Sequence, residues 1–225
     1  AYTNIQGGLI MSEKILLIVG AGPGISLNTA RKFGKEGFKV SLISRSIESL
    51  QKYENELKND GIAAKGFPGD VSSEGSLKTA IDTVIKTYGK IDVLLYNVAS
   101  GTPGKPTTLN LDQLVEDFKI SVAGALTSVK EVIPHMENGT ILLTGGGLAL
   151  HPFADYASLA IGKAGIRNLA YSLHQELSPK GIYVGTLTIK GFVQERTYFS
   201  AENIANALYS MYENQTETEI IFEEK

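Results

Sequence analysis

The chain has 225 residues, with 21 basic and 24 acidic side chains, a formal net charge of -3 and a hydrophobic content of 43%. This composition excludes disordered and collagen-like classes, and the length suits a single α/β domain. The sequence has no cysteine and only 3 histidines, which excludes a disulfide scaffold, a thiolate zinc site and a cysteine nucleophile and predicts no metal site.

The same numbers narrow the range of partners and compartments. A nearly balanced charge gives no support for nucleic acid as a partner. No apolar run reaches the roughly 18 residues that span a membrane, and no signal peptide is visible, so we expect a cytoplasmic protein. Residues 1–10 precede Met11 and look polar and patternless. We interpret them as a tag or leader and expect the domain to occupy residues 11–225.

Short aliphatic runs alternate with stretches of helical period from Lys14 onward. Strands are predicted at residues 15–19, 40–43, 64–67, 91–95, 141–143, 182–189 and 220–222. Helices are predicted at residues 25–36, 47–59, 74–88, 111–136, 156–177 and 201–213. Nearly continuous apolar strands indicate a sheet that is buried on both faces and therefore parallel. The pattern predicts one domain with a doubly wound parallel α/β sheet, the Rossmann fold.

The first predicted strand runs into a glycine-rich turn that contains Gly20, Gly22 and Gly24, and a helix follows from Ile25. Glycines permit a tight turn and let the backbone approach a pyrophosphate, which the helix N-terminus then stabilises. Three glycines alone also fit a bare turn. Their place after the first strand of a βαβ unit favours dinucleotide binding instead.

The second predicted strand ends at Ser44 and Arg45. A site for NAD would carry Asp or Glu here to bind the ribose hydroxyls, whereas an arginine can meet the 2′-phosphate of NADP. We therefore predict NADP as the cofactor and NAD as the less favoured one. A solvated arginine at the end of a strand is the alternative interpretation.

Four landmarks follow one another in order over residues 14–222. They are the turn at residues 20–26, Gly69-Asp70-Val71, Tyr96-Asn97-Val98-Ala99-Ser100, and Lys163-Ala164-Gly165. Together they resemble the short-chain dehydrogenase/reductase family, with Ser26 where the family has its last glycine. The resemblance implies that Asp70 and Val71 contact the adenine and that Asn97 and Ala99 belong to the cofactor site. It also implies that Lys163 is the family's catalytic lysine, retained here, and that it contacts the nicotinamide ribose.

Each landmark has a simpler structural interpretation as well. Asp70 could cap the helix that follows it. Asn97 could bridge strand and loop backbone without touching a ligand. Lys163 could be an ordinary surface lysine.

The residues that the family uses for catalysis do not match. The family transfers a hydride between nicotinamide and a carbonyl or alcohol, with a tyrosine one helical turn before the lysine and a serine upstream. The tyrosine position is Leu159, the serine position is Gly146, and Ser121 replaces an asparagine of the preceding helix. The resemblance therefore implies an NADP-binding, nominally oxidoreductase protein with lost or altered hydride transfer.

Two further hypotheses remain open. An active NADPH-dependent carbonyl reductase could use a rearranged proton donor, either Tyr156 or His151, with the hydroxyl of Thr144 nearby. Tyr156 lies seven residues before Lys163, about 10.5 Å along a helix, which is too far for the usual pairing. Alternatively, the chain is a structural subunit that does not bind nucleotide.

The segment after the sixth predicted strand is short. Only residues 192–199 separate Gly191 from Ser200, where the family usually has a longer lid over the substrate. The substrate therefore stays an unknown small molecule. The resemblance also implies a homodimer or homotetramer that assembles through the helices predicted at 111–136 and 156–177.

Overall fold

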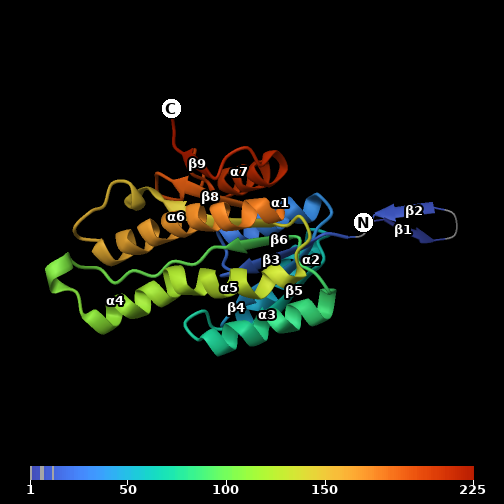
Figure 1. The fold of residues 1–225 in the computed structure, drawn as a ribbon, viewed down its shortest axis with the longest axis horizontal. Helices are drawn as coiled ribbons and strands as arrows, with labels where there is room; N and C mark the ends of the chain where they lie inside the picture. Colours follow the sequence, from blue (N-terminus) through green and yellow to red (C-terminus); the bar gives the residue numbers. More distant parts are fainter. Residues whose placement is uncertain (1, 6–7, 12) are drawn as a thin grey trace.

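A single parallel sheet forms the centre of the computed structural model, which describes residues 2–5, 8–11 and 13–225. The order of the strands is β5-β4-β3-β6-β7-β8-β9 (Figure 1). They are β3 (Ile15–Val19), β4 (Lys39–Ser44), β5 (Ala64–Pro68), β6 (Val93–Tyr96), β7 (Thr140–Gly146), β8 (Tyr183–Ile189) and β9 (Glu219–Phe222). The chain enters at β3 in the interior of the sheet, builds outward to β5, and then crosses to β6 on the other side of β3. The predicted doubly wound parallel sheet is thus confirmed.

Helices cover both faces of this sheet (Figure 1). One face carries α1 (Ile25–Lys35), α2 (Ile47–Asn59) and α7 (Ala201–Asn214). The other carries α3 (Glu74–Tyr88), α5 (Gly124–Val132) and α6 (Ala157–Leu177), with α4 (Leu111–Phe118) packed against α6. All five residues of β3 are buried, because successive side chains enter the cores on opposite faces.

The long helix predicted at residues 111–136 is interrupted, so that expectation was wrong in detail. A π-helical turn over Lys119–Ala123 separates α4 from α5, and a 3₁₀ turn over Ile133–His135 follows. The hydroxyl of Tyr96 donates a hydrogen bond to the carbonyl of Ile120 inside the π turn. Gly124 leaves room for that hydroxyl, because a Cβ at this position would collide with it.

The other predicted elements exist, with shifted ends. The strand predicted at 141–143 spans Thr140–Gly146, and the one predicted at 91–95 spans Val93–Tyr96. The helix predicted from residue 156 begins at Ala157, and Tyr156 is its N-cap. These differences leave the order of the elements unchanged.

The segment interpreted as a tag or leader contains two short strands rather than no pattern. β1 (Tyr2–Ile5) and β2 (Gly8–Met11) pair antiparallel in a sheet of their own. Residues 1, 6, 7 and 12 lie outside the described residues. The interpretation of residues 1–10 as a tag or leader stays a prediction.

Candidate functional site

The turns that carry the predicted cofactor residues all follow strands of the parallel sheet. Because parallel strands point the same way, these turns meet at the carboxyl edge of the sheet, at the point where the chain reverses between β3 and β6. The structure therefore gathers at one edge the glycine turn after β3, the ends of β4 and β5, and the turn after β6. Lys163, on α6, lies beside Gly146 at the end of β7.

Gly20 is required by its backbone conformation and by its neighbours. Its φ of +97° is a conformation that side-chain-bearing residues rarely adopt. A Cβ there would collide with the side chain of Val98 and the backbone carbonyl of Asn97. Its N–H donates to the carbonyl of Ile43 at 3.0 Å. Gly20 thus holds the turn against both neighbouring strands, β4 and β6.

Gly22 and Gly24 face open space instead. A Cβ at either position would meet no atom within 4 Å. The N-cap of α1 at Gly24 has no side-chain hydrogen bond, whereas α2, α3, α4 and α7 each have a side-chain cap. Open space beside the free N–H groups of a helix N-terminus fits a phosphate group. Ile25 begins this helix and is half-buried.

Ser26, which replaces the family's last glycine, ties this turn to β6. Its hydroxyl donates to the carbonyl of Gly20 at 2.7 Å and accepts from the Asn97 amide at 2.8 Å. The other end of that amide, Oδ1, accepts from the hydroxyl of Thr144 at 2.9 Å. The side chains of Asn97 and Thr144 therefore bridge three strand ends, and the Thr144 hydroxyl is engaged in this bridge.

Arg45 and Asp70, which are predicted to bind the adenosine half of the cofactor, lie near each other. Arg45 is exposed at the end of β4, next to half-buried Ser44. The hydroxyl and backbone N–H of Ser72 lower the pKa of Asp70, and the positive charge of Arg45 lowers it further. Asp70 does not cap the following helix, as one interpretation held, because Ser73 is the N-cap of α3.

Two apolar residues predicted at the cofactor site differ in exposure. Val71 is half-buried and packs against the core beneath α3 and α5, so it forms the floor of the β5–α3 turn. Ala99 is exposed in the turn after β6. Both follow strands at the carboxyl edge, where the resemblance places the adenine and the rest of the cofactor.

Lys163 lies across the position where the family has its serine. A Cβ at Gly146 would stand 3.2 Å from Cε and 3.3 Å from Cδ of Lys163, so the alkyl chain of the lysine covers this glycine. Burial lowers the pKa of Lys163 below its usual value. Within the described part of the chain, no carboxylate lies within 4.0 Å of its Nζ. Lys163 is a half-buried cation without an acidic partner, not an ordinary surface lysine.

The family's tyrosine position is apolar and covered on one side. A Cβ at Gly101 would stand 2.5 Å from the Cβ of Leu159, which shows how closely the turn after β6 packs on this part of α6. The two substitute donors lie outside the helix. Tyr156 has a non-helical φ of −123° and is 53% exposed, so the spacing along a regular helix does not apply to it. His151 is exposed in the loop after β7, and neither residue has a hydrogen bond to Lys163.

A buried carboxylate that the sequence analysis missed stands beside the tyrosine position. Asp117, on α4, is 2% exposed and has no cation beside it. Its four donors are the Ser100 hydroxyl at 3.0 Å, the Thr102 N–H at 2.7 Å, the Gln113 amide at 3.2 Å and the Ser158 hydroxyl at 2.7 Å. Burial acts to raise the pKa of Asp117, but these hydrogen bonds outweigh it and hold the pKa at about 2. The carboxylate thus joins the turn after β6 to α4 and α6.

Ser121 is also hydrogen-bonded to the turn after β6. Its hydroxyl donates to the carbonyl of Ser100 at 3.0 Å and accepts from the Ser100 N–H at 2.9 Å. A signal for both residues was present in the sequence: Leu114, Asp117 and Ser121 share one face of a helix. Only the fold shows that this face turns toward the protein interior.

The segment after β8 is as short as the sequence suggests. Residues 190–200, all of them described, contain no helix or strand. Gly191 backs onto the ring of Phe199, whose carbonyl accepts a hydrogen bond from the N–H of Gln194 at 3.1 Å. Phe192 is 93% exposed. This segment folds back on itself, and the edge of the sheet is left uncovered by any helix from it.

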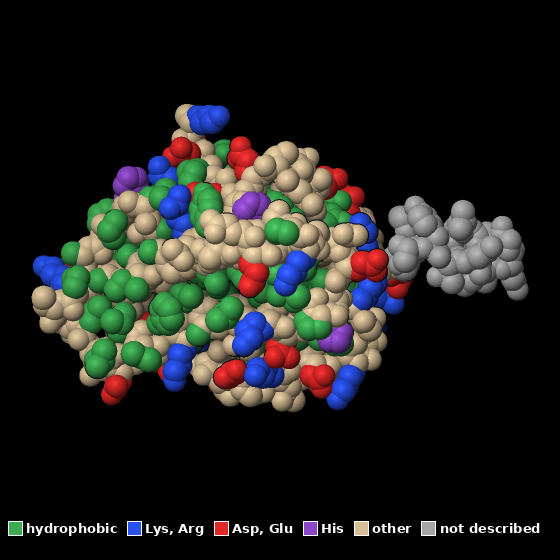
Figure 2. All heavy atoms as spheres, in the orientation of Figure 1, with side chains coloured by type: hydrophobic (Ala, Val, Ile, Leu, Met, Phe, Trp, Pro, Cys, Tyr) green, Lys and Arg blue, Asp and Glu red, His purple; other side chains and the backbone are tan. Residues whose placement is uncertain are grey.

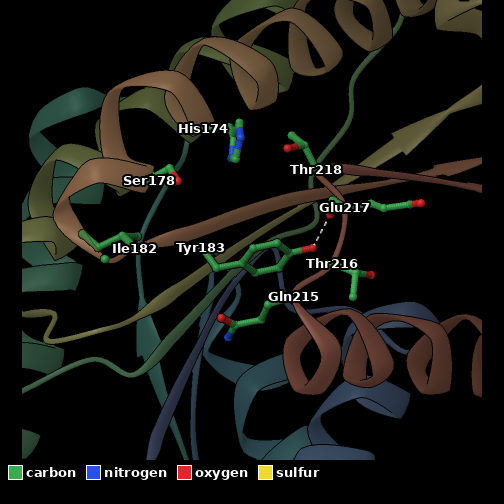
Figure 3. Close-up of a pocket in the computed structure, with 9 residues that line it drawn as sticks. His174, Ser178, Ile182, Tyr183, Gln215, Thr216, Glu217 and Thr218 are labelled. Atoms are coloured by element: carbon green, nitrogen blue, oxygen red, sulfur yellow. Dashed lines mark hydrogen bonds between the residues drawn. The ribbon is translucent and has the colours of Figure 1, made fainter.

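A surface cavity of about 320 Å³ lies elsewhere in the molecule (Figure 3). His174, Tyr183 and Gln215 are among its lining residues, and the hydroxyl of Tyr183 donates to the carbonyl of Glu217 at 2.6 Å. These residues precede or begin β8 and β9, so the cavity opens at the amino edge of the sheet. It is separate from the carboxyl edge where the cofactor residues gather.

The described residues contain neither a metal-binding cluster nor a membrane-spanning helix. No group of three or more His, Cys, Asp or Glu side chains there is placed to hold a metal ion. No helix in those ranges has the length and apolar content needed to cross a membrane.

Comparison with known proteins identifies relatives in sequence. A family model described as short chain dehydrogenase matches residues 14–201. Tropinone reductase-like 3 of Erythroxylum coca is 29% identical over 169 residues, which cover 74% of this chain and 65% of that protein. A protein of Streptomyces coelicolor, provisionally named a ketoacyl reductase, is 32% identical over 192 residues, which cover 81% of this chain and 71% of that protein. The chain thus spans from 65% to 71% of the length of these two relatives.

Solved structures share the fold over almost the whole chain. A metagenomic short-chain oxidoreductase in complex with NADP has a TM-score of 0.84 at 21% identity, covering 92% of this chain and 95% of that chain. A dehydrogenase/reductase of Sinorhizobium meliloti has a TM-score of 0.86 at 18% identity, covering 94% of each chain. At these identities the likeness shows the fold alone.

Proposed function

Because the chain belongs to the short-chain dehydrogenase family, we propose that it binds NADP(H) at the carboxyl edge of its sheet and works with altered hydride-transfer chemistry. The observation that carries this proposal is the glycine turn after β3. Gly20 cannot be replaced there without a collision, while Gly22 and Gly24 open onto space beside the uncapped N-terminus of α1. The open space and the free N–H groups of the helix N-terminus together support a phosphate site at this turn.

Different residues would bind different parts of the cofactor. The N-terminus of α1 would bind the pyrophosphate through backbone N–H groups, and Arg45 would meet the 2′-phosphate. Asp70 and Val71 would contact the adenine, while Asn97 and Ala99 would support the nicotinamide half. Lys163 would reach the nicotinamide ribose. When bound, NADPH supplies a hydride to an electrophilic carbon.

The altered chemistry follows from the residues at the end of β7 and the start of α6. Gly146 has no hydroxyl to polarise a carbonyl, and Leu159 has no proton to give. The relatives carry names that refer to ketone reduction, tropinone in one and a ketoacyl group in the other. By analogy, we propose a small carbonyl compound as the substrate class of this chain.

Titration of the protein with NADPH and with NADH, followed by cofactor fluorescence or calorimetry, tests the cofactor assignment. We expect tighter binding of NADPH, and Arg45→Ala should weaken it about tenfold while leaving NADH within about twofold. Lys58→Ala is the matched control, because it removes an exposed cation at the far end of α2. Failure of both cofactors to bind at millimolar concentration would contradict the proposal and favour a structural subunit.

We also propose that the chain forms a homodimer or homotetramer through α4, α5 and α6. Hydrophobic side chains gather over α4 and α5 on the face shown in Figure 2. The most exposed large hydrophobic residues of α4, α5 and α6 are Leu111 (72%), Val115 (47%), Ile161 (46%), Phe118 (43%) and Leu126 (43%). A contiguous apolar face of this kind is typical of a surface that is covered in an assembly.

A further inference from the structure

The side chain of Lys163 occupies the place of one missing catalytic group and lies one helical turn from the other. Its alkyl chain covers Gly146, with Cε 3.2 Å from the point where a Cβ would stand. A Cβ at position 146 would make the lysine chain shift by a few tenths of an ångström, so the glycine lets the chain lie close against the end of β7. The cation of Lys163 is thereby held beside the position that the resemblance aligns with the family's serine.

We propose that Lys163 is itself the proton donor in carbonyl reduction by this protein. The inference rests on the proposed function, since it needs NADPH to be bound. It gives Lys163 a role beyond contact with the cofactor ribose. It also predicts that neither Tyr156 nor His151 is needed for the reaction.

Three hydroxyl groups on β7, the π turn and α6 are already engaged. Thr144 donates to Asn97 at 2.9 Å, and Ser121 donates to the carbonyl of Ser100 at 3.0 Å. Ser158 donates to Asp117 at 2.7 Å. Each hydroxyl has a single hydrogen, so none of these three is free to protonate a substrate without breaking a bond that holds the fold.

The charged groups nearby also leave Lys163 as the available acid. Lys190, which follows β8, packs against Gly147 but pairs with Glu223 at 2.8 Å. The Asp117 carboxylate is saturated by its four donors and stays ionised. Desolvation lowers the pKa of Lys163 with no opposing carboxylate, which moves its ammonium toward the acid strength that a general acid needs near neutral pH.

The proton balance of the step is simple. The carbonyl carbon takes the hydride, which brings two electrons, and the carbonyl oxygen takes one proton from the Lys163 ammonium. One N–H bond breaks, one O–H bond forms, and the products are an alcohol and oxidised NADP. The neutral amine then takes a proton from water, which the uncovered edge of the sheet admits.

A first test reads the lysine directly in the protein without cofactor. Lysine carbons are labelled with ¹³C at Cε, and the resonance of Lys163 is assigned from its loss in Lys163→Arg. We expect this resonance to titrate clearly below the ordinary lysine value of about 10.4, with exposed Lys58 as the internal reference. Titration of Lys163 at the same pH as Lys58 would overturn the proposal.

A second test uses chemical rescue. NADPH oxidation is followed with a panel of aldehydes and ketones, and NADPH affinity is measured separately for each variant. Lys163→Ala should lower kcat about 100-fold or more, and small primary amines should restore about tenfold of it, with stronger acids restoring more. Lys58→Ala is the control, and Tyr156→Phe and His151→Ala should leave kcat within about twofold.

The outcomes separate this inference from the proposed function. Wild-type protein that binds no NADPH contradicts the proposed function. Protein that binds NADPH but reduces no carbonyl overturns the donor role of Lys163. Activity that amines do not restore in Lys163→Ala, while NADPH still binds, overturns it as well. Loss of activity in Tyr156→Phe or His151→Ala would assign the proton to that residue instead.

Discussion

Three glycines at this site have different surroundings. Gly20 is fixed by its positive φ and by the backbone of the turn after β6, whereas a Cβ at Gly22 would meet no atom within 4 Å. Gly146 differs again, because a lysine side chain lies over it. The sequence shows the same letter at all three positions. Their environments differ: the first is packed within the turn, the second borders open space and the third lies against the alkyl chain of Lys163.

Asp117 offers a test at this scale through the pH dependence of stability. Its folded pKa of about 2 lies below the unfolded value of 3.8, so its contribution is present above 3.8 and is lost as the pH falls toward 2. Asp117→Asn replaces an acceptor oxygen by a donor among donor groups. It should lower the free energy of unfolding by about 2–3 kcal/mol at pH 6.

Urea unfolding at a series of pH values measures this effect. The gap between wild type and Asp117→Asn should narrow as the pH falls from 4 toward 2. The control is Asp82→Asn, which removes an exposed carboxylate paired with Lys86 on α3. A gap that stays constant over this range would contradict the assignment of an ionised, hydrogen-bonded Asp117.

Strand β6 and helix α6 both contact the π turn between α4 and α5. The π turn over Lys119–Ala123 frees the carbonyl of Ile120, and the buried hydroxyl of Tyr96 on β6 bonds to it. α6 approaches the same turn through two glycines. A Cβ at Gly162 would stand 3.0 Å from Ser121, and a Cβ at Gly165 would stand 2.8 Å from Val122. The turn therefore sets how closely the strand and the two helices approach beside Lys163.

A double-mutant cycle at Gly124 and Tyr96 tests this arrangement. Gly124→Ala should cost about 1–3 kcal/mol in the wild type, because the new methyl group collides with the Tyr96 hydroxyl. In a Tyr96→Phe background the nearest ring atom lies 3.2 Å away, and the cost should fall by about 1 kcal/mol or more. Chemical denaturation measures all four proteins. Costs that simply add would show that the hydroxyl does not set the turn.

At the scale of the whole molecule, large hydrophobic side chains of α4, α5 and α6 are exposed to solvent. Val115 and Phe118 lie on α4 and its junction with the π turn, and 47% and 43% of their surfaces are exposed. Glutamate at both positions should convert the proposed dimer or tetramer to monomer, because charges do not stay buried without partners. Sedimentation equilibrium gives the mass. Ile47→Glu on α2, where 60% of the residue is exposed, is the control, and a monomeric wild type would contradict the proposal.

The order of the elements and the glycine turn after the first strand could be predicted from the sequence because both depend on local pattern. Aliphatic runs mark the strands of a sheet buried on both faces, and glycines after the first strand mark a phosphate turn. The prediction that Gly146 and Leu159 replace the serine and tyrosine also rests on fixed spacings from Lys163, and it stays a prediction. These features need no knowledge of which side chains meet.

The tertiary structure alone decided what surrounds those residues. The π turn carries a hydrogen bond between Tyr96 and Ile120, which lie 24 residues apart, and Asp117 bonds to Ser158, which is 41 residues away. The placement of Lys163 over Gly146 joins a helix to a strand end. Local propensity cannot encode such contacts, because their free energy depends on burial and on partners that only folding brings together. The sequence by itself determined the doubly wound fold of the short-chain dehydrogenase family, and the packing decided which side chains surround Gly146 and Leu159.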